Sequence, residues 1–495
     1  MTSTGKSKRN KPDRVRVERD SLGEREIPAD AYYGIQTLRA LENFRASGTT
    51  HPESLLRAYV MIKKAAALAN EELGALDRLR ASAIGWACDQ ILDGRHHDQF
   101  RLDAYQAGAG TSYNMNVNEV VANLALERLG RSRGDYAHLS PNDHVNMAQS
   151  TNDTFPTAMN VAVLLELPSL NSALRKLVSA LRSKGKQFRQ VMKSGRTHLQ
   201  DAVPITLGQE FDAQAEAVEI GRMEISRRSA LLHEIALGGT AVGTGLNTPP
   251  KLSQTAAKYL SRLSGLKLKP AGNLIFAVQS NYRIASLSGA LRDLALELIR
   301  IANDLRLLSS GPTTGISEIT LPAVQPGSSI MPGKVNPVMA ECLNMIAFRV
   351  VGNDLSVALA VQAGQLDLNV MMPLMAFNLL ESIRLLARYI PDFTERCVKG
   401  ITVNRDRCTQ YFERSIGLAT ALSPYVGYLK AAEIAHEAFS SGESIKSLAI
   451  KKGILSEAEF ERTTNPLGNV APGTGGRRNP KKSTAGANPR RRDDR

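Results

Sequence analysis

The chain has 495 residues, 43% of them hydrophobic, which is long enough for two or three domains with their own cores. Its formal net charge of +14 is concentrated at the two ends, because residues 1–20 carry +4 and residues 471–495 carry +6. The body between them is nearly balanced, which argues against a nucleic-acid-binding protein.

The first predicted segment is a basic, disordered leader at residues 1–15, and a basic, disordered tail is predicted at residues 471–495. Both segments are polar and lack apolar periodicity, so we expect them to be solvated. Weak attraction to polyanions or acidic membranes is the alternative. The N-terminus has no apolar signal region, and Asp13 and Glu18 interrupt its basic run, so no secretory or transit peptide is expected.

Residues 16–150 are predicted to form an N-terminal domain that mixes short helices with loops. Residues 65–72 and 122–129 have the composition of helices. Residues 108–118 read GAGTSYNMNVN, and this run of Gly, Ser and Asn predicts a segment that is not helical.

Residues 151–405 are predicted to form a central helical-bundle domain. Apolar residues alternate at spacings of three and four in a seam that closes near Pro312; its members are Ile284, Leu287, Leu291, Leu294, Leu298, Ile301, Leu305 and Leu308. A second seam runs over residues 163–181 with Pro168 as an expected kink, and a third, polar-rich helix is predicted at about 208–236. Helices of this length need a bundle, within one subunit or between subunits.

Residues 406–470 are predicted to form a small C-terminal helical domain of shorter segments, which makes the fold class mainly all-α. No run of about eighteen apolar residues is present, so no membrane span is expected. The four cysteines show no metal-ligand spacing, which favours reduced thiols in a cytoplasmic protein.

Four segments are dense in small hydrogen-bonding groups: residues 108–119, 149–154, 195–201 and 327–337. Taken singly, each has an ordinary interpretation as a helix cap or a turn. The last reads GSSIMPGKVNP, which cannot continue a helix or strand and is therefore predicted to be a loop. Its hydroxyls, lysine and carboxamide suit a small anion.

Taken together, the four segments indicate a neutral-to-positive pocket for a small dianion. The sequence has no glycine-rich nucleotide fingerprint, no Walker pattern and no ligand-spaced His/Cys set, which disfavours nucleotide cofactors and zinc. A cofactor-free acid–base reaction on a dicarboxylate fits these residues. His198 is the obvious base by residue type, but lone histidines are often structural, so its role stays open at this point.

The loop at 327–337 resembles the signature of the aspartase/fumarase superfamily, and the similarity extends from about Val17 to Leu467. The run GKVN at 333–336 is similar to that of the aspartase and class II fumarase branch. Within that branch, YQAGAGTS at 105–112, STND at 150–153, Ser140 and ADAYYG at 29–34 all resemble aspartases more than fumarases. Met372 and Gln362 depart from the pattern, because aspartases carry Glu at both positions.

The resemblance implies a three-domain fold whose central bundle forms the core of a homotetramer, with sites shared between subunits. It implies reversible deamination of L-aspartate to fumarate and ammonia, with Ser328 as the base. The other site residues that it implies are Thr111, Ser150, Thr151 and Ser329 for the beta-carboxylate, Thr197, Lys334 and Asn336 for the alpha-carboxylate, and Asn152 and His198 near the amine.

The resemblance also implies that the enzyme uses no cofactor, and it leaves activation by a divalent cation such as Mg²⁺ open. The expected partners are a small dicarboxylate and further copies of the chain, with no specific nucleic acid and no membrane. The alternatives are a class II fumarase, in which water replaces ammonia, and a catalytically silent, structural use of the lyase scaffold.

Overall fold

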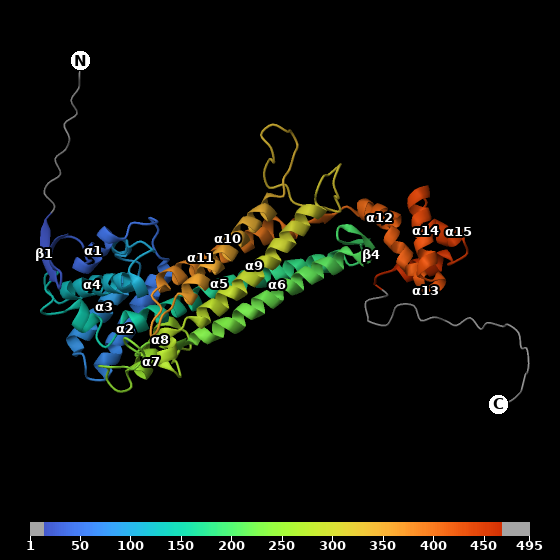
Figure 1. Ribbon diagram of the computed structural model, residues 1–495. Helices are drawn as coiled ribbons and strands as arrows, with labels where there is room; N and C mark the ends of the chain where they lie inside the picture. The colour runs from blue at the N-terminus through green and yellow to red at the C-terminus, as the bar shows by residue number, and fades with distance from the viewer. Residues whose placement is uncertain (1–13, 468–495) are drawn as a thin grey trace, which may run out of the picture. The chain divides into compact units, whose positions relative to one another are not determined.

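The computed structural model describes residues 14–467, and over this range the fold is mainly helical, as the sequence predicts (Figure 1). The predicted leader and tail lie outside the described residues, except for Arg14 and Val15. The described residues form two compact units, each built from three stretches of chain. The predicted division at 16–150, 151–405 and 406–470 stays a prediction.

The first unit takes residues 14–179, Glu216–Asp304 and Val324–Val398, and the second takes Ala180–Ala215, Leu305–Ala323 and residues 399–467. The elements up to residue 150 are β1 (Val15–Asp20), β2 (Gly23–Pro28), α1 (Ile35–Asn43), α2 (Glu53–Glu72), α3 (Arg78–Leu92), η1 (His97–Gln99), η2 (Gly108–Gly110), α4 (Thr111–Arg128) and η3 (Pro141–Val145). Strands β1 and β2 form an antiparallel hairpin. The buried carboxylate of Glu119 in α4 accepts hydrogen bonds from backbone N–H groups at the start of α1, and these bonds join the two helices.

The prediction that residues 108–118 are not helical is wrong beyond Gly110, because α4 begins at Thr111. Gly110 has a φ of 85° and separates the short turn η2 from this helix. Asn114, Asn116 and Asn118 have low intrinsic helix propensity, but all three are buried in the structure. Tertiary packing therefore outweighs local preference here.

Five long helices form a bundle, and most of their residues belong to the first unit (Figure 1). They are α5 (Thr151–Gln187), α6 (Leu207–Ser229), α9 (Tyr282–Leu308), α10 (Val338–Gln362) and α11 (Met372–Arg396). Side-chain hydrogen bonds join neighbours in the bundle: Arg222 to Asn171 (α6–α5, 2.8 Å), Ser288 to Asp354 (α9–α10, 2.6 Å) and Asn353 to Ser382 (α10–α11, 3.1 Å). A Cβ on Gly221 of α6 would lie 2.9 Å from Leu294 of α9, so these two helices meet closely.

The predicted seam of α9 is confirmed, because its members from Ile284 to Leu305 are buried. Helix α5 continues through Pro168, where a kink was expected. The polar-rich helix predicted at 208–236 is α6, and it ends earlier, at Ser229. Between α6 and α9 the chain forms η4 (Ala230–His233), β5 (Glu234–Ile235), α7 (Leu252–Ser264), β6 (Lys269–Pro270) and α8 (Leu274–Gln279).

Helix α10 is the one described helix that is long and apolar enough to cross a membrane by length and composition alone. It carries the buried polar residues Asn344, Asn353 and Asp354, and each of them has a hydrogen-bonded partner on a neighbouring helix. Such partnered polar groups are typical of a helix packed inside a bundle.

The second unit contains the hairpin of β3 (Met192–Thr197) and β4 (Gln200–Thr206) and a group of short helices. Its remaining elements are β7 (Ile319–Thr320), η5 (Val398–Gly400), β8 (Thr402–Val403), α12 (Arg405–Arg414), η6 (Ile416–Leu422), α13 (Ser423–Val426), α14 (Tyr428–Ser441), α15 (Ile445–Lys451) and α16 (Glu457–Thr464). Strands β7 and β8 pair antiparallel. Leu422, Ile434, Leu448 and Phe460 belong to the apolar core of the C-terminal helices.

Candidate active site

The segment at 327–337 is a loop between β7 and α10, as predicted, and it is braced across its own base. The N–H of Gly327 donates to the carbonyl of Lys334 at 2.8 Å, and Asn336 Nδ2 donates to the carbonyl of Gly327 at 2.5 Å. A Cβ on Gly327 would lie 2.6 Å from the Lys334 carbonyl oxygen, so only glycine permits this approach. Gly333, with a φ of 80°, also requires the freedom of glycine.

The hydroxyl of Ser328 lies where two backbone N–H groups of the loop are directed at it. Its Oγ accepts hydrogen bonds from the backbone N–H groups of Ile330, at 3.2 Å, and Met331, at 3.0 Å. Donors directed at an oxygen favour its negatively charged form, so this arrangement lowers the cost of forming a serine alkoxide. The ammonium group of Lys334 has no ion-pair partner within residues 14–467, which leaves it available for an anion.

The hydroxyls of Thr111 and Thr151 both lie at the start of a helix. Thr111 is the first residue of α4, and Thr151 is the first residue of α5, directly after Ser150. Unpaired N–H groups and the helix dipole make a helix N-terminus favourable for a carboxylate. Two of the four predicted segments therefore present hydroxyls where an anion is favoured.

A buried lysine joins these two helix N-termini. Lys63 of α2 is fully buried, and its Nζ donates to Asn114 Oδ1 at 2.7 Å, Asn146 Oδ1 at 2.9 Å and Gln149 Oε1 at 3.0 Å. Asn114 is in the first turn of α4, and Gln149 directly precedes Ser150. Burial lowers the pKa of the Lys63 ammonium to about 7.

The start of α5 is also fastened to the segment after β5. Asp153 is fully buried, and its carboxylate accepts the backbone N–H groups of Ser150 at 3.0 Å, Gly238 at 3.0 Å and Thr240 at 2.8 Å. Burial raises the pKa of Asp153 to about 7, although these three donors favour its charged form. Asn152 Nδ2 donates to the carbonyl of Ala241 at 2.8 Å, so the predicted amine-side residue is anchored to the same segment.

The turn before α11 supports the other helix N-terminus. The carbonyl of Val370 accepts the N–H of Ala109 at 2.8 Å, directly before Gly110 and Thr111. No residue with a side chain fits at position 110, because a Cβ on Gly110 would lie 2.0 Å from the ring of Phe155. Met372, which departs from the aspartase pattern, is fully buried at the start of α11, two residues beyond Val370.

Thr197 and His198 lie at the tip of the β3–β4 hairpin, in the second unit. The two residues at the turn, His198 and Leu199, have φ angles of 54° and 60°. This left-handed pair is the geometry that Asn-Gly normally adopts in a two-residue turn, so a His-Leu pair stores backbone strain. The side chains of Thr197, His198 and Leu199 are exposed.

The structure thus arranges the predicted residues in three groups. Thr111 and residues 150–152 are held together through Lys63, residues 328–336 form the self-braced loop, and Thr197 and His198 share the hairpin tip. Within residues 14–467, no hydrogen bond or ion pair joins the loop to Thr111 or to residues 150–152. In the same range, no cluster of three or more His, Cys, Asp or Glu side chains could hold a metal ion.

Comparison with known proteins gives consistent results. The family described as Lyase matches residues 23–352, and the family described as Fumarase C C-terminus matches residues 418–468. An aspartate ammonia-lyase from a Bacillus species is 49% identical over 465 residues, which covers 94% of this chain and 99% of the relative.

Two solved structures share the fold. A fumarate lyase:delta crystallin from Brucella melitensis, bound to cobalt, has a TM-score of 0.88 and 51% identity over 93% of this chain and all of that one. A class II fumarase from Schistosoma mansoni also has a TM-score of 0.88, with 38% identity over 92% of this chain and 98% of that one.

Proposed function

This chain belongs to the aspartase/fumarase family of lyases, and we propose that it converts L-aspartate reversibly to fumarate and ammonia. The observation that carries the proposal is the environment of Ser328, whose Oγ receives two backbone N–H donors in a loop that also presents Lys334. The choice of ammonia over water follows the higher identity to the aspartate ammonia-lyase relative than to the class II fumarase.

In the proposed reaction, the Ser328 alkoxide removes a proton from the carbon beside the beta-carboxylate of aspartate. The electron pair moves into that carboxylate and forms an enediolate dianion, which is the species that must be stabilised. Its collapse forms the carbon–carbon double bond of fumarate and breaks the carbon–nitrogen bond, so that ammonia leaves. Each preorganised donor at the developing charge contributes about 10²–10³-fold in rate, by analogy with oxyanion holes.

The helix N-termini of α4 and α5 suit the enediolate. We assign Thr111, Ser150 and Thr151 to the beta-carboxylate, because hydroxyls next to helix N-termini stabilise negative charge there, and Ser329 to the same group as the hydroxyl that follows Ser328 in the loop. Thr197, Lys334 and Asn336 are assigned to the alpha-carboxylate, and Asn152 and His198 to the amine. Asn336 now donates to Gly327, so substrate binding would exchange this internal bond for one to the carboxylate.

The proposed activity predicts that the purified protein releases fumarate from L-aspartate and not from L-malate. The measurement follows fumarate absorbance in the ultraviolet with each substrate offered separately. Turnover of L-malate alone would identify a class II fumarase, and turnover of neither would identify a silent lyase scaffold. Because the proposed chemistry needs no cofactor, activity should survive removal of bound metal, and any stimulation by Mg²⁺ would be activation.

We further propose that the enzyme is a homotetramer built on the long helices. One face of α10 exposes four large apolar side chains at helical spacing: Met345 (63%), Phe348 (57%), Leu355 (62%) and Leu359 (60%). An apolar stripe of this length on a water-soluble enzyme is typical of a subunit interface. Among residues 14–467 the loop at 327–337 bonds within itself and not to the N-termini of α4 and α5, which fits a site whose parts come from different subunits.

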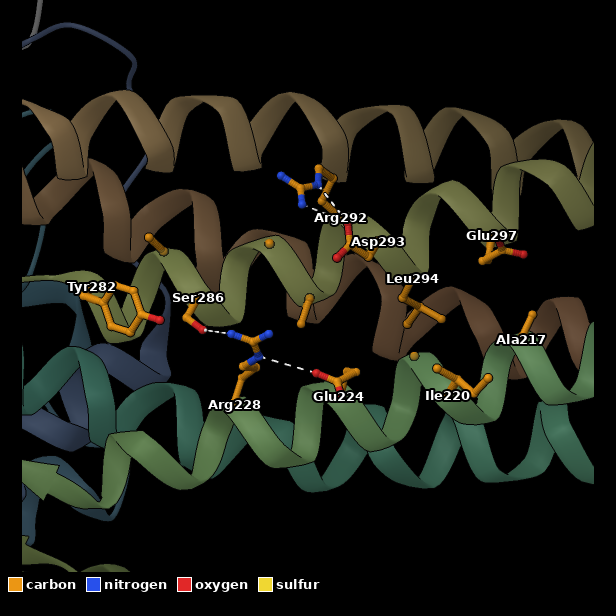
Figure 2. Close-up of a pocket in the computed structure, with 14 residues that line it drawn as sticks. Ala217, Ile220, Glu224, Arg228, Tyr282, Ser286, Arg292, Asp293, Leu294 and Glu297 are labelled. Carbon is orange, nitrogen blue, oxygen red and sulfur yellow. Dashed lines mark hydrogen bonds and ion pairs between the residues drawn. The ribbon is translucent and has the colours of Figure 1, made fainter.

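A groove between α6 and α9 is a second surface suited to such an interface (Figure 2). It has a volume of about 480 Å³ and holds none of the predicted site residues. Figure 2 shows Arg228 of α6 bridging Glu224 on its own helix and Ser286 on α9, at 3.4 and 2.8 Å. Its lining includes Gly221, which lets α6 and α9 approach closely, and Gly289, where a Cβ would meet only the side chain of Arg292.

Shared sites predict that two inactive variants can complement each other. We expect Ser328→Ala and Thr151→Ala each to be nearly inactive, and mixed tetramers formed by co-expression to regain at least about tenfold more activity than either parent. The gain arises because a site can then take its loop from one subunit and its α5 N-terminus from another. Activity that stays at the parental level, or a fully active monomer in gel filtration, would contradict the shared site.

The remaining proposals concern the surroundings of the enzyme. Cys88, Cys397 and Cys408 are buried free thiols and Cys342 is partly buried, which supports a reducing compartment such as the cytoplasm. The near-balanced charge of the body argues against specific nucleic-acid binding, and the similarity to aspartate ammonia-lyases supports a small dicarboxylate as partner.

A further inference from the structure

Four charged side chains form a cluster along the hairpin that carries Thr197 and His198: Lys193 and Glu318 are buried, and Arg196 and Glu210 are partly exposed. Glu318 is completely buried, and its two carboxylate oxygens contact Lys193 Nζ and Arg196 Nη2, both at 2.8 Å. Lys193 Nζ also donates to both oxygens of Glu210, at 2.8 and 2.9 Å. Two cations and two anions make the cluster neutral, which is the condition for keeping such charges buried.

Glu318 is held rigidly by its own backbone. Its N–H donates to the carbonyl of Leu308 at 2.9 Å, and its carbonyl accepts the N–H of Asn404 at 2.9 Å. The next two residues form β7, which pairs with β8. Its side chain therefore extends from a fixed point that belongs to neither strand of the hairpin.

Arg196 connects Glu318 to the hairpin tip. It directly precedes Thr197, and its guanidinium lies 5.4 Å from the centre of the Tyr411 ring as well as contacting Glu318. Beyond Arg196 the hairpin is exposed and turns through the strained pair of His198 and Leu199. The ion pair with Glu318 is thus the last side-chain anchor before the tip.

We propose that Glu318 is a positioning residue, which fixes the tip of the β3–β4 hairpin through Arg196 and thereby sets the place of Thr197 and His198. This inference rests on the proposed function, in which Thr197 holds the alpha-carboxylate. Glu318 itself touches no substrate. A displacement of about 1 Å at a binding group can lower the rate by about 10²-fold, so a rigid anchor next to the tip has a functional effect.

The test begins with Glu318→Gln, which keeps the shape and removes the charge. We expect kcat/KM for L-aspartate to fall by about 10- to 100-fold, mainly through a higher KM. Arg196→Met should give the same KM increase and serves as a second variant, because Glu318 then stays paired with Lys193. The matched control is Lys184→Met, which removes a buried ammonium from the same unit; this group bonds Gln187 at 2.9 Å and the Ile401 carbonyl at 2.8 Å, and neither partner belongs to the hairpin. Its kinetics per folded enzyme should be unchanged.

A double-mutant cycle separates positioning from a general structural role. If Glu318 acts through Thr197, adding Glu318→Gln to Thr197→Ala should lower kcat/KM by no more than about threefold further. Losses that multiply, or an unchanged KM in Glu318→Gln and Arg196→Met, would overturn the inference. A wild-type enzyme without activity on L-aspartate would instead overturn the proposed function, so the two failures are distinguishable.

Discussion

Replacing Ser328 by Ala is expected to lower kcat for L-aspartate by about 10³-fold or more while the tetramer stays assembled. The variant lacks the oxygen that removes the proton, and a positioned base contributes about 10²–10⁴-fold. Ser329 is the other hydroxyl of the loop, but among residues 14–467 its Oγ receives no backbone N–H donors like those directed at Ser328, and Asn336 donates to Gly327. Ile330 and Met331 are exposed residues, so water can bond their N–H groups after the substitution, and we expect the fold to be kept.

Isotope exchange makes the test specific for the base. Wild-type enzyme in D₂O should place deuterium on the beta-carbon of recovered L-aspartate, and Ser328→Ala should not. Val335→Ala, in the same loop and without a polar group, is the control for a general disturbance of the loop and should exchange normally. Substantial exchange in Ser328→Ala would show that another group removes the proton.

The long helices and the loop could be predicted because the information for them is local. The three–four spacing from Ile284 to Leu305 needs only a helix and an apolar partner, and α9 buries that seam. The loop at 327–337 follows from glycine and proline alone. The sequence pattern alone could not predict that α4 begins at Thr111, because the buried Asn114 and Asn116 bond to Lys63 and Gln99, which lie 51 and 17 residues away.

The residues that hold the candidate site in place could not be predicted from the sequence either. Lys63 and Lys64 stand side by side in an apolar helix and have the same local pattern, yet one is fully buried and the other forms a partly exposed ion pair with Asp89. Which lysine points inward depends on Asn114 and Gln149, which lie 51 and 86 residues away. The only local signal was the presence of a charged residue in a stretch otherwise suited to the core.

Replacing Lys63 by Met is expected to have the second largest effect, on both stability and rate. Methionine fills the same space but leaves the oxygens of Asn114, Asn146 and Gln149 without their donor. Leaving a buried acceptor unpaired costs about 1–3 kcal/mol; Asn114 is buried, whereas Asn146 and Gln149 are half-buried and can bond water, so we expect the free energy of unfolding to fall by about 3 kcal/mol. Because these residues align the starts of α4 and α5, kcat/KM for L-aspartate should fall by about 10²-fold.

The adjacent Lys64→Met is the matched control, because it removes only a partly exposed ion pair worth less than about 1 kcal/mol. The pH dependence of stability gives a second test that is specific for the Lys63 ammonium. Burial lowers the pKa of Lys63 to about 7 from an ordinary value of 10.5, so unfolding takes up a proton between these two pH values. The stability of wild type relative to Lys63→Met should therefore rise with pH across this window. If Lys63→Met instead matches Lys64→Met in melting temperature and in kcat/KM, the buried lysine does not align the two helix N-termini.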